Sequence, residues 1–143
     1  MKFKILFIIT ITIALMAAKS VFLTTGIAEH KSFSKPEEVR EFALGKVELL
    51  KLNGATIGRA TFQPGWRWST SLKEKSGTKS CEAPHYQYHV SGTLRILMDD
   101  GTTFDCKAGD LSSLPMGHDA WVIGKEPVVV VDFQGMMDYA KTK

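Results

Sequence analysis

From residue 46 onward, apolar and polar residues alternate along the chain in short runs that are separated by glycine-containing turns. The runs 46–52 and 55–62 flank Asn53-Gly54, two residues that tolerate positive φ, and this arrangement predicts a β-hairpin. Short strands at this spacing predict an all-β fold, either a sandwich or an antiparallel barrel. Further strands are expected at 84–90, 93–98, 102–107, 111–114, 118–123 and 128–133.

The segment 34–45 instead carries the signals of a short helix. Ser34 suits the cap position, Pro36 the first turn and Glu37 the third position after the cap. Apolar residues then recur at helical spacing, and a glycine closes the segment. We therefore expect a lead-in with one short N-terminal helix over 29–45, the β-barrel over 46–133 and a C-terminal tail over 134–143.

Two tryptophans, Trp66 and Trp68, alternate around Arg67 in a piece that is expected to be extended. We interpret them as aromatic side chains that pack on one face of the sheet. The alternative is an exposed pair that stacks on a ligand, and exposure of both side chains would favour it. The polar, lysine-containing stretch 69–80 predicts a mobile surface loop.

Residues 1–20 have the pattern of a secretory signal peptide. Lys2 and Lys4 precede an apolar run over 5–18, which is short for a membrane span of about 20 residues. Cleavage after Ser20, or as late as Ala28, would export the protein to the periplasm or the extracellular space, with no further membrane contact. The alternative is an uncleaved N-terminal anchor.

The length of 143 residues predicts a single domain, and the charge argues against a nucleic-acid partner. The formal net charge is +3, from 18 basic and 15 acidic residues. Three of the basic residues, Lys2, Lys4 and Lys19, lie in the signal region. The remaining chain is neutral, so it offers no basic surface for phosphates.

Two segments resemble the sequence motifs of the cupin superfamily. Residues 88–94 resemble the end of the first cupin motif, in which an apolar strand reaches a glycine turn at Gly92. Gly109, followed after five residues by the run 115–117, resembles the start of the second motif. The resemblance covers residues 49–133. It implies a small single-domain cupin with degenerate metal motifs, an antiparallel jelly-roll barrel and a homodimer.

Cupins normally bind a metal through two histidines and a glutamate of the first motif and one histidine of the second. The matching positions of this chain hold Lys79, Cys81, His85 and Ala120, so none has its usual residue. Cys81 and His85 are nevertheless metal ligands in other proteins. His118 lies two residues before the position of the lost histidine.

Four residues form the candidate metal site: His85, His118, Cys81 and His89. His85 and His89 share one face of their expected strand, and the resemblance places that face inside the barrel. Sulfur and imidazole ligands suit a divalent transition metal (Zn, Fe, Cu, Ni or Mn), and the scarcity of carboxylates argues against a hard cation. The alternatives are a metal-free cavity and a disulfide between Cys81 and Cys106, which would remove the thiolate.

These features are compatible with three functions. The first is an exported single-domain cupin that binds a small molecule and a divalent metal in the barrel cavity without turnover. The second is a metal-dependent enzyme, an oxygenase or isomerase, that acts on a small organic substrate. The third is a sensor or protein-interaction module. The sequence has no nucleophile-elbow serine, phosphate loop or dinucleotide fingerprint.

Overall fold

The computed structural model describes residues 27–141, which are built mainly from antiparallel β-strands. The predicted signal peptide therefore lies outside the described residues. None of the described helices is long and apolar enough to cross a membrane. The elements are β1 (Glu38–Phe42), β2 (Gly45–Leu52), β3 (Ala55–Phe62), α1 (Trp68–Ser71), α2 (Lys73–Ser76), β4 (His85–Ser91), β5 (Thr93–Met98), β6 (Thr103–Lys107), β7 (Leu111–Leu114), β8 (His118–Ile123) and β9 (Val128–Asp132).

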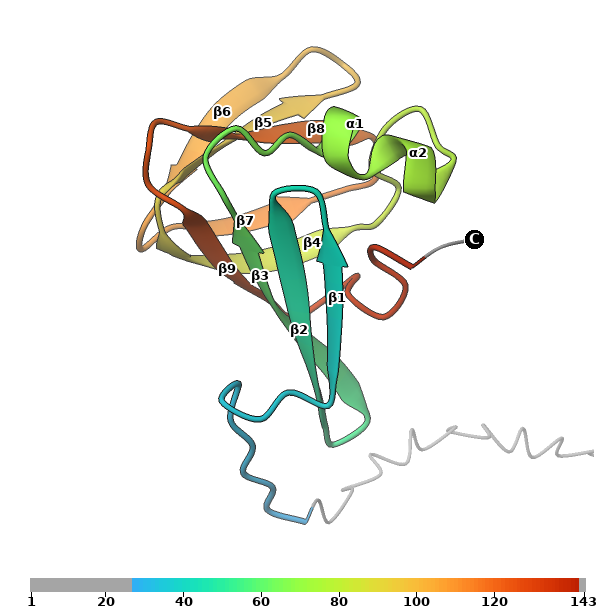
Figure 1. Cartoon of the computed structure of the whole chain (residues 1–143), viewed down its shortest axis with the longest axis vertical. Helices are drawn as coiled ribbons and strands as arrows, with labels where there is room; N and C mark the ends of the chain where they lie inside the picture. Colours follow the sequence, from blue (N-terminus) through green and yellow to red (C-terminus); the bar gives the residue numbers. More distant parts are fainter. Residues whose placement is uncertain (1–26, 142–143) are drawn as a thin grey trace, which may run out of the picture.

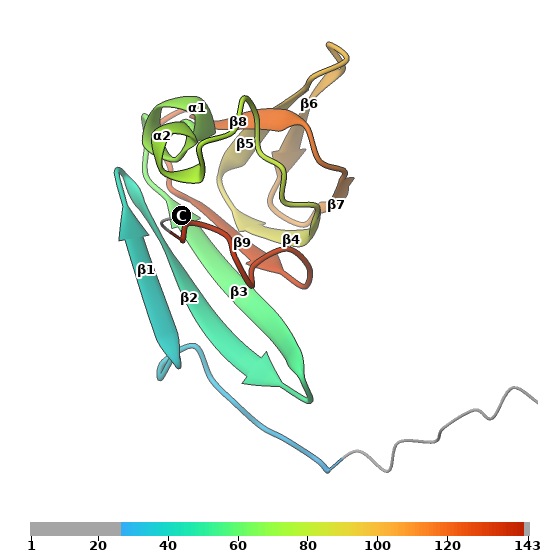
Figure 2. The same ribbon diagram turned by 90° about the vertical axis from the view of Figure 1, so that its right-hand side faces the viewer.

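The strands form two sheets that enclose one core (Figure 1 and Figure 2). One sheet has the order β1-β2-β3-β9-β4-β7 and the other has the order β6-β5-β8. Leu94 and Ile96 of β5 and Val128 and Val130 of β9 are almost fully buried in this core. Figure 2 shows β1 and β2 reaching away from the barrel, with the two short helices at one of its ends. The predicted all-β barrel of the jelly-roll type is confirmed.

The hairpin predicted at Asn53-Gly54 is confirmed. Strands β2 and β3 pair in register from Gly45 opposite Phe62 to Leu52 opposite Ala55. The two turn residues have φ values of 47° and 80°, which is the backbone conformation that Asn and Gly tolerate best.

The helix predicted within 34–45 is wrong, because this segment forms strand β1. Residues 38–42 pair antiparallel with β2, and Leu44, with φ of 59°, makes the turn between the two strands. The extended backbone points Arg40 inward while Val39 and Glu41 stay exposed. Pairing with a distant part of the chain therefore outweighs the local cap signals at Ser34.

The polar stretch after Trp68 contains the single-turn helices α1 and α2 rather than only loop. Asp119 anchors it, because its carboxylate accepts hydrogen bonds from the Ser69 backbone N–H (3.0 Å), the Ser69 hydroxyl (2.9 Å) and Arg67 Nε (2.6 Å). Trp66 and Trp68 are 1% and 3% exposed. The interpretation of this pair as packing residues is confirmed, and neither forms an exposed stacking surface.

Residues 134–141 fold back over one end of the barrel and are called the C-terminal strap below. The side chains of its residues Met136 and Tyr139 are buried. Gly135, with φ of 88°, passes so close to the Pro84 carbonyl that a Cβ would overlap it. The Arg40 guanidinium holds the strap by donating hydrogen bonds to three of its carbonyl oxygens, those of Met136 (3.1 Å), Met137 (3.0 Å) and Tyr139 (2.6 Å).

Candidate metal centre

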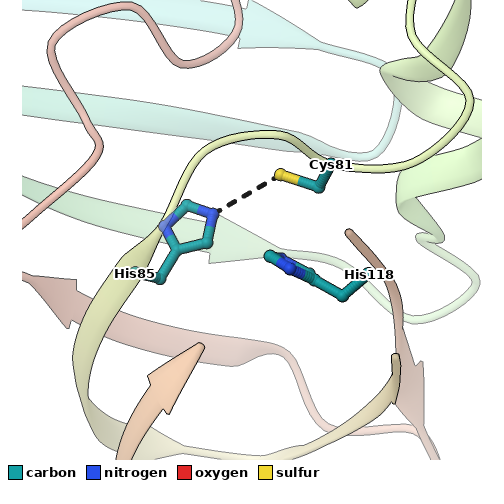
Figure 3. A group of neighbouring side chains, drawn as sticks. All are labelled: Cys81, His85 and His118. Carbon is teal, nitrogen blue, oxygen red and sulfur yellow. Dashed lines mark hydrogen bonds between the residues drawn. The ribbon is translucent and has the colours of Figure 1, made fainter. Parts of the chain in front are cut away.

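Cys81, His85 and His118 converge beneath the strap (Figure 3). His85 begins β4, His118 begins β8, and Cys81 lies in the loop that leads into β4. One donor atom from each lies within 4.8 Å of the other two, and Cys81 Sγ is 3.6 Å from His85 Nε2. All three residues are buried. The structure thus brings together three of the four residues that the sequence suggested.

Backbone pairing fixes Cys81 beside His118. The Cys81 N–H donates to the His118 carbonyl, and the Gly117 N–H donates to the Cys81 carbonyl, each at 2.8 Å. This isolated antiparallel bridge pairs Cys81 with the first residue of β8. The thiol is therefore held in place by the turn at 115–117, and its position does not depend on a disulfide.

A carboxylate orients His85. Its Nδ1–H donates to Asp132 Oδ2 at 2.5 Å, which turns Nε2 toward Cys81. Asp132 is fully buried, and its Oδ2 also accepts from the Gln87 side-chain amide at 3.0 Å, while its Oδ1 accepts from the backbone N–H groups of Tyr86 and Gln134. A histidine that binds a metal usually donates its other ring N–H to such a carboxylate, which fixes the tautomer.

A backbone carbonyl orients His118 in the same manner. Its Nδ1–H donates to the Pro115 carbonyl oxygen at 2.9 Å, so Nε2 is the ring nitrogen that could bind a metal. The His118 ring lies edge-on to the His85 ring, with 5.4 Å between the ring centres. Asp119, the next residue along the chain, instead accepts hydrogen bonds from Arg67 and Ser69.

The electrostatics of the cluster favour a thiolate. Burial raises the pKa of Cys81, but the neighbouring His118 and His85 outweigh it and lower that pKa to about 6. Burial lowers the pKa of His85, but its bonds to Asp132 and Cys81 raise it to about 9. In the metal-free protein the pair is therefore a thiolate beside an imidazolium, with Asp132 behind it.

The three residues fit a soft or borderline metal ion. A tetrahedral zinc ion separates a thiolate sulfur from an imidazole nitrogen by about 3.5 Å, which the Cys81–His85 distance already matches. Nε2 is the ligand atom of both histidines because their Nδ1 atoms have acceptors of their own, and metal binding would displace the Nε2 proton of the His85 imidazolium. One thiolate and two imidazoles are the ligands that zinc and copper prefer.

The fourth predicted ligand, His89, lies outside this cluster. It is buried, and its Nε2 lies 2.9 Å from the Ser112 hydroxyl. Cys81 and Cys106 are both free and buried, so the alternative of a disulfide between them is not realised in the structure.

Two cavities lie on either side of Cys81. The inner one has a volume of about 20 Å³, and buried side chains of the barrel line it, among them His85, His118 and Gln87. The outer one is a surface pocket of about 590 Å³ between α2, the loop before β4 and the strap. Among the three candidate ligands, only Cys81 lines both.

Sequence reasoning did not assign a role in this site to Asp132 or Tyr139. A signal for Asp132 exists, since Val128, Val130 and Asp132 alternate toward the same buried face of β9. Tyr139 packs edge-on against His85, with 5.4 Å between ring centres, and lines both cavities. Nothing in the tail's sequence marks it, because the contact depends on how the strap folds back.

The chain resembles solved structures of oxalate decarboxylase. It matches the Lactobacillus farciminis enzyme in its formate complex (20% identity, TM-score 0.50), a single-residue variant of the Bacillus subtilis enzyme (26%, 0.51) and the Bacillus subtilis enzyme at pH 4.6 (26%, 0.50). Each match covers 69% of this chain, but this chain spans only 31%, 28% and 27% of theirs.

Oxalate decarboxylase is a cupin, and the chain therefore has the cupin-type fold that its two motifs predicted. No protein-family model matches the sequence, and no curated protein matches it. The likeness concerns the barrel fold, and the support for the set of Cys81, His85 and His118 comes from this chain alone.

Proposed function

We propose that this protein is an exported cupin that binds one transition metal ion through Cys81, His85 and His118. The observation that carries the proposal is the convergence of the three donor atoms, with both histidines oriented by a second hydrogen bond. A Cys–His–Asp chain acting without metal would need only one histidine. The second, independently oriented histidine is what a metal site requires.

The ligand types support zinc or copper over a hard cation. Thiolate is a soft ligand and imidazole a borderline one, whereas manganese and magnesium prefer carboxylate, carbonyl and water oxygens. When bound, such an ion would supply Lewis acidity. The chain's own contribution is to hold Cys81 as a thiolate, to fix both imidazole tautomers and to exclude bulk water with the strap.

Binding without turnover agrees better with the cavities than the oxygenase or isomerase alternative does. An organic substrate of such an enzyme would have to lie beside the metal, and the inner cavity of about 20 Å³ has no room for one. The outer pocket of about 590 Å³ is within the range of small-molecule sites, roughly 300–1,000 Å³. A small-molecule ligand is therefore assigned to the outer pocket.

Export is supported by the sequence of the first 20 residues, in which two lysines precede an apolar run. Mass spectrometry of the intact protein from a bacterial periplasm would give the mature N-terminus. A mass that retains Met1 would contradict cleavage.

Metal content tests the proposal directly. The tag-free protein is reconstituted with zinc or copper(I), desalted and analysed by elemental mass spectrometry. One ion per chain is expected for wild type, with strong loss in Cys81→Ala, His85→Ala and His118→Ala. His30→Ala is the matched control, because His30 is exposed and distant from the cluster in the sequence. Wild-type protein without stoichiometric metal would refute the proposal.

A further inference from the structure

Two buried polar atoms of the inner cavity have no hydrogen-bond partner among the described residues. They are Trp66 Nε1, which can only donate, and Gln87 Oε1, which can only accept. Both side chains line the cavity that His85, His118 and Cys81 also line. Buried polar groups are nearly always hydrogen-bonded, because leaving one unpaired destabilises the fold, so this pair needs an explanation.

The Gln87 amide cannot turn to avoid this cost. Its Nε2 donates to Asp132 Oδ2 at 3.0 Å, and Asp132 at the same time accepts from His85. Flipping the amide would place its oxygen against the carboxylate. One buried carboxylate thus fixes two things, the tautomer of a metal ligand and the direction of a free acceptor. Trp66 is fixed as well, because its ring stacks on Phe62 with 3.9 Å between ring centres.

The size of the cavity defines what fits. A volume of about 20 Å³ holds one water molecule, for which about 10–15 Å³ is needed, and little more. A water there would accept from Trp66 and donate to Gln87, and its remaining lone pair would face the three candidate ligands. Buried waters typically have two to four polar partners. This site supplies a donor in Trp66, an acceptor in Gln87 and the polar atoms of the candidate ligands.

We infer that Trp66 and Gln87 form a binding site for one water-sized ligand on the inner side of the metal centre, which restricts the fourth metal position to ligands such as water or cyanide. Only the restriction of the fourth metal position rests on the proposed metal site. The hydrogen bonds to Trp66 and Gln87 do not require the metal.

The metal-free protein tests the first half. In a ¹⁵N-labelled sample, the Trp66 indole proton should show a nuclear Overhauser cross-peak to a long-lived water. Trp66→Phe identifies the resonance. The cross-peak should be lost in Gln87→Leu, which removes the acceptor, and in Ala120→Val, which fills the cavity that Ala120 lines. Trp121→Phe is the matched control and should retain it, because Trp121 packs against Arg67 and does not line the cavity. A wild-type protein without the cross-peak, or a cross-peak that survives both variants, would overturn the inference.

The cobalt(II)-loaded protein tests the second half. Cyanide should change its visible d–d spectrum, whereas imidazole, which exceeds the cavity, should leave it unchanged. An equal response to imidazole would overturn the size restriction. If cobalt does not bind at all, the proposed metal site fails, while the water site stands or falls on the metal-free experiment.

Discussion

Each candidate ligand in this protein has a second partner that fixes its orientation before any metal binds. A backbone bridge fixes Cys81, the carboxylate of Asp132 fixes His85, and the carbonyl of Pro115 fixes His118. Ligands held in this way lose little conformational freedom on binding, because their rotamers are already selected. His89 is the exception: its Nε2 hydrogen-bonds Ser112, and it does not lie with the donor atoms of the other three.

Asp132→Asn tests this arrangement at the scale of a single residue. His85 and Gln87 both donate to Oδ2 of Asp132, and Oδ1 accepts from two backbone N–H groups. The amide is neutral and has one acceptor oxygen, so in either orientation its NH2 group faces one of these two sets of donors. Metal affinity should fall by about 10–100-fold, the usual effect of removing a partner that orients a ligand. Competition with a chromophoric zinc chelator measures it. Asp119→Asn is the control, since Asp119 bonds Arg67 and Ser69, and its affinity should equal that of wild type.

The strands were predictable because their signals are local. Period-two alternation and glycine turns fix β2 to β9, and Asn53-Gly54 alone identifies one hairpin. The N-terminal helix was mispredicted because the cap signals at 34–37 are equally local, whereas pairing with β2 and the inward role of Arg40 are not visible in a short window. The strap has no periodic pattern at all.

The candidate site divides in the same way. The motif resemblance and strand alternation placed Cys81, His85 and His118 together, since each lies at a defined position next to a turn. The alternation also put His89 on the same face of β4, and that inference about the face is right. It could not show that His89 bonds Ser112 across the β4–β7 region rather than pointing toward Cys81.

At the scale of secondary-structure elements, the strap is held chiefly by the side chain of Arg40. Arg40 projects from β1 and donates to three strap carbonyls, while Tyr139 of the strap covers His85. Hydrogen bonds from a charged guanidinium to buried carbonyls contribute about 1.5–3 kcal/mol each to the free energy of unfolding, before the cost of ordering the chain. The strap should therefore loosen when Arg40 is replaced, and the thiol beneath it should become accessible.

Arg40→Met tests this prediction. The variant should lose about 2 kcal/mol or more of unfolding free energy, and Cys81 should react faster with iodoacetamide, as followed by peptide mass spectrometry. Arg95→Met is the matched control, because Arg95 forms a surface ion pair with Asp105 on the other sheet. Its stability should change little, because an exposed ion pair contributes little, and its Cys81 reactivity should be unchanged. Equal Cys81 reactivity in both variants would show that the strap does not shield the site.

At the scale of the whole molecule, large side chains from both sheets and from the strap fill the barrel. Phe62 and Trp66 stack in its interior, and Trp68 and Tyr139 close the end beside Cys81. This packing explains why only a water-sized cavity remains next to the candidate ligands. A barrel of the same topology with smaller residues at these positions would leave more room beside the candidate ligands.

The stability of the molecule in acid should depend on Glu48, which ties β2 to β3 on the face away from this cavity. Its carboxylate is largely buried and accepts from Arg59 Nε at 2.8 Å and from Lys46 Nζ at 3.2 Å. The hydrogen bond from Arg59 is the main cause that lowers the pKa of Glu48, and it outweighs burial. A lowered pKa means that the stabilisation is complete above the ordinary carboxyl range and is lost as the pH falls through the folded-state pKa.

Glu48→Gln should therefore be less stable than wild type at neutral pH, by on the order of 1 kcal/mol. The effect is modest because the partners of Glu48, Arg59 and Lys46, are partly exposed to solvent, which weakens the ion pairs. The difference should shrink to nothing in strong acid, where the wild-type carboxyl is protonated in both states. Urea unfolding across a pH series measures both curves. Glu41→Gln, which removes an exposed carboxylate of β1, should show no such pH-dependent gap. A gap between Glu48→Gln and wild type that persists unchanged in acid would mean that packing, and not the charge of Glu48, accounts for its contribution.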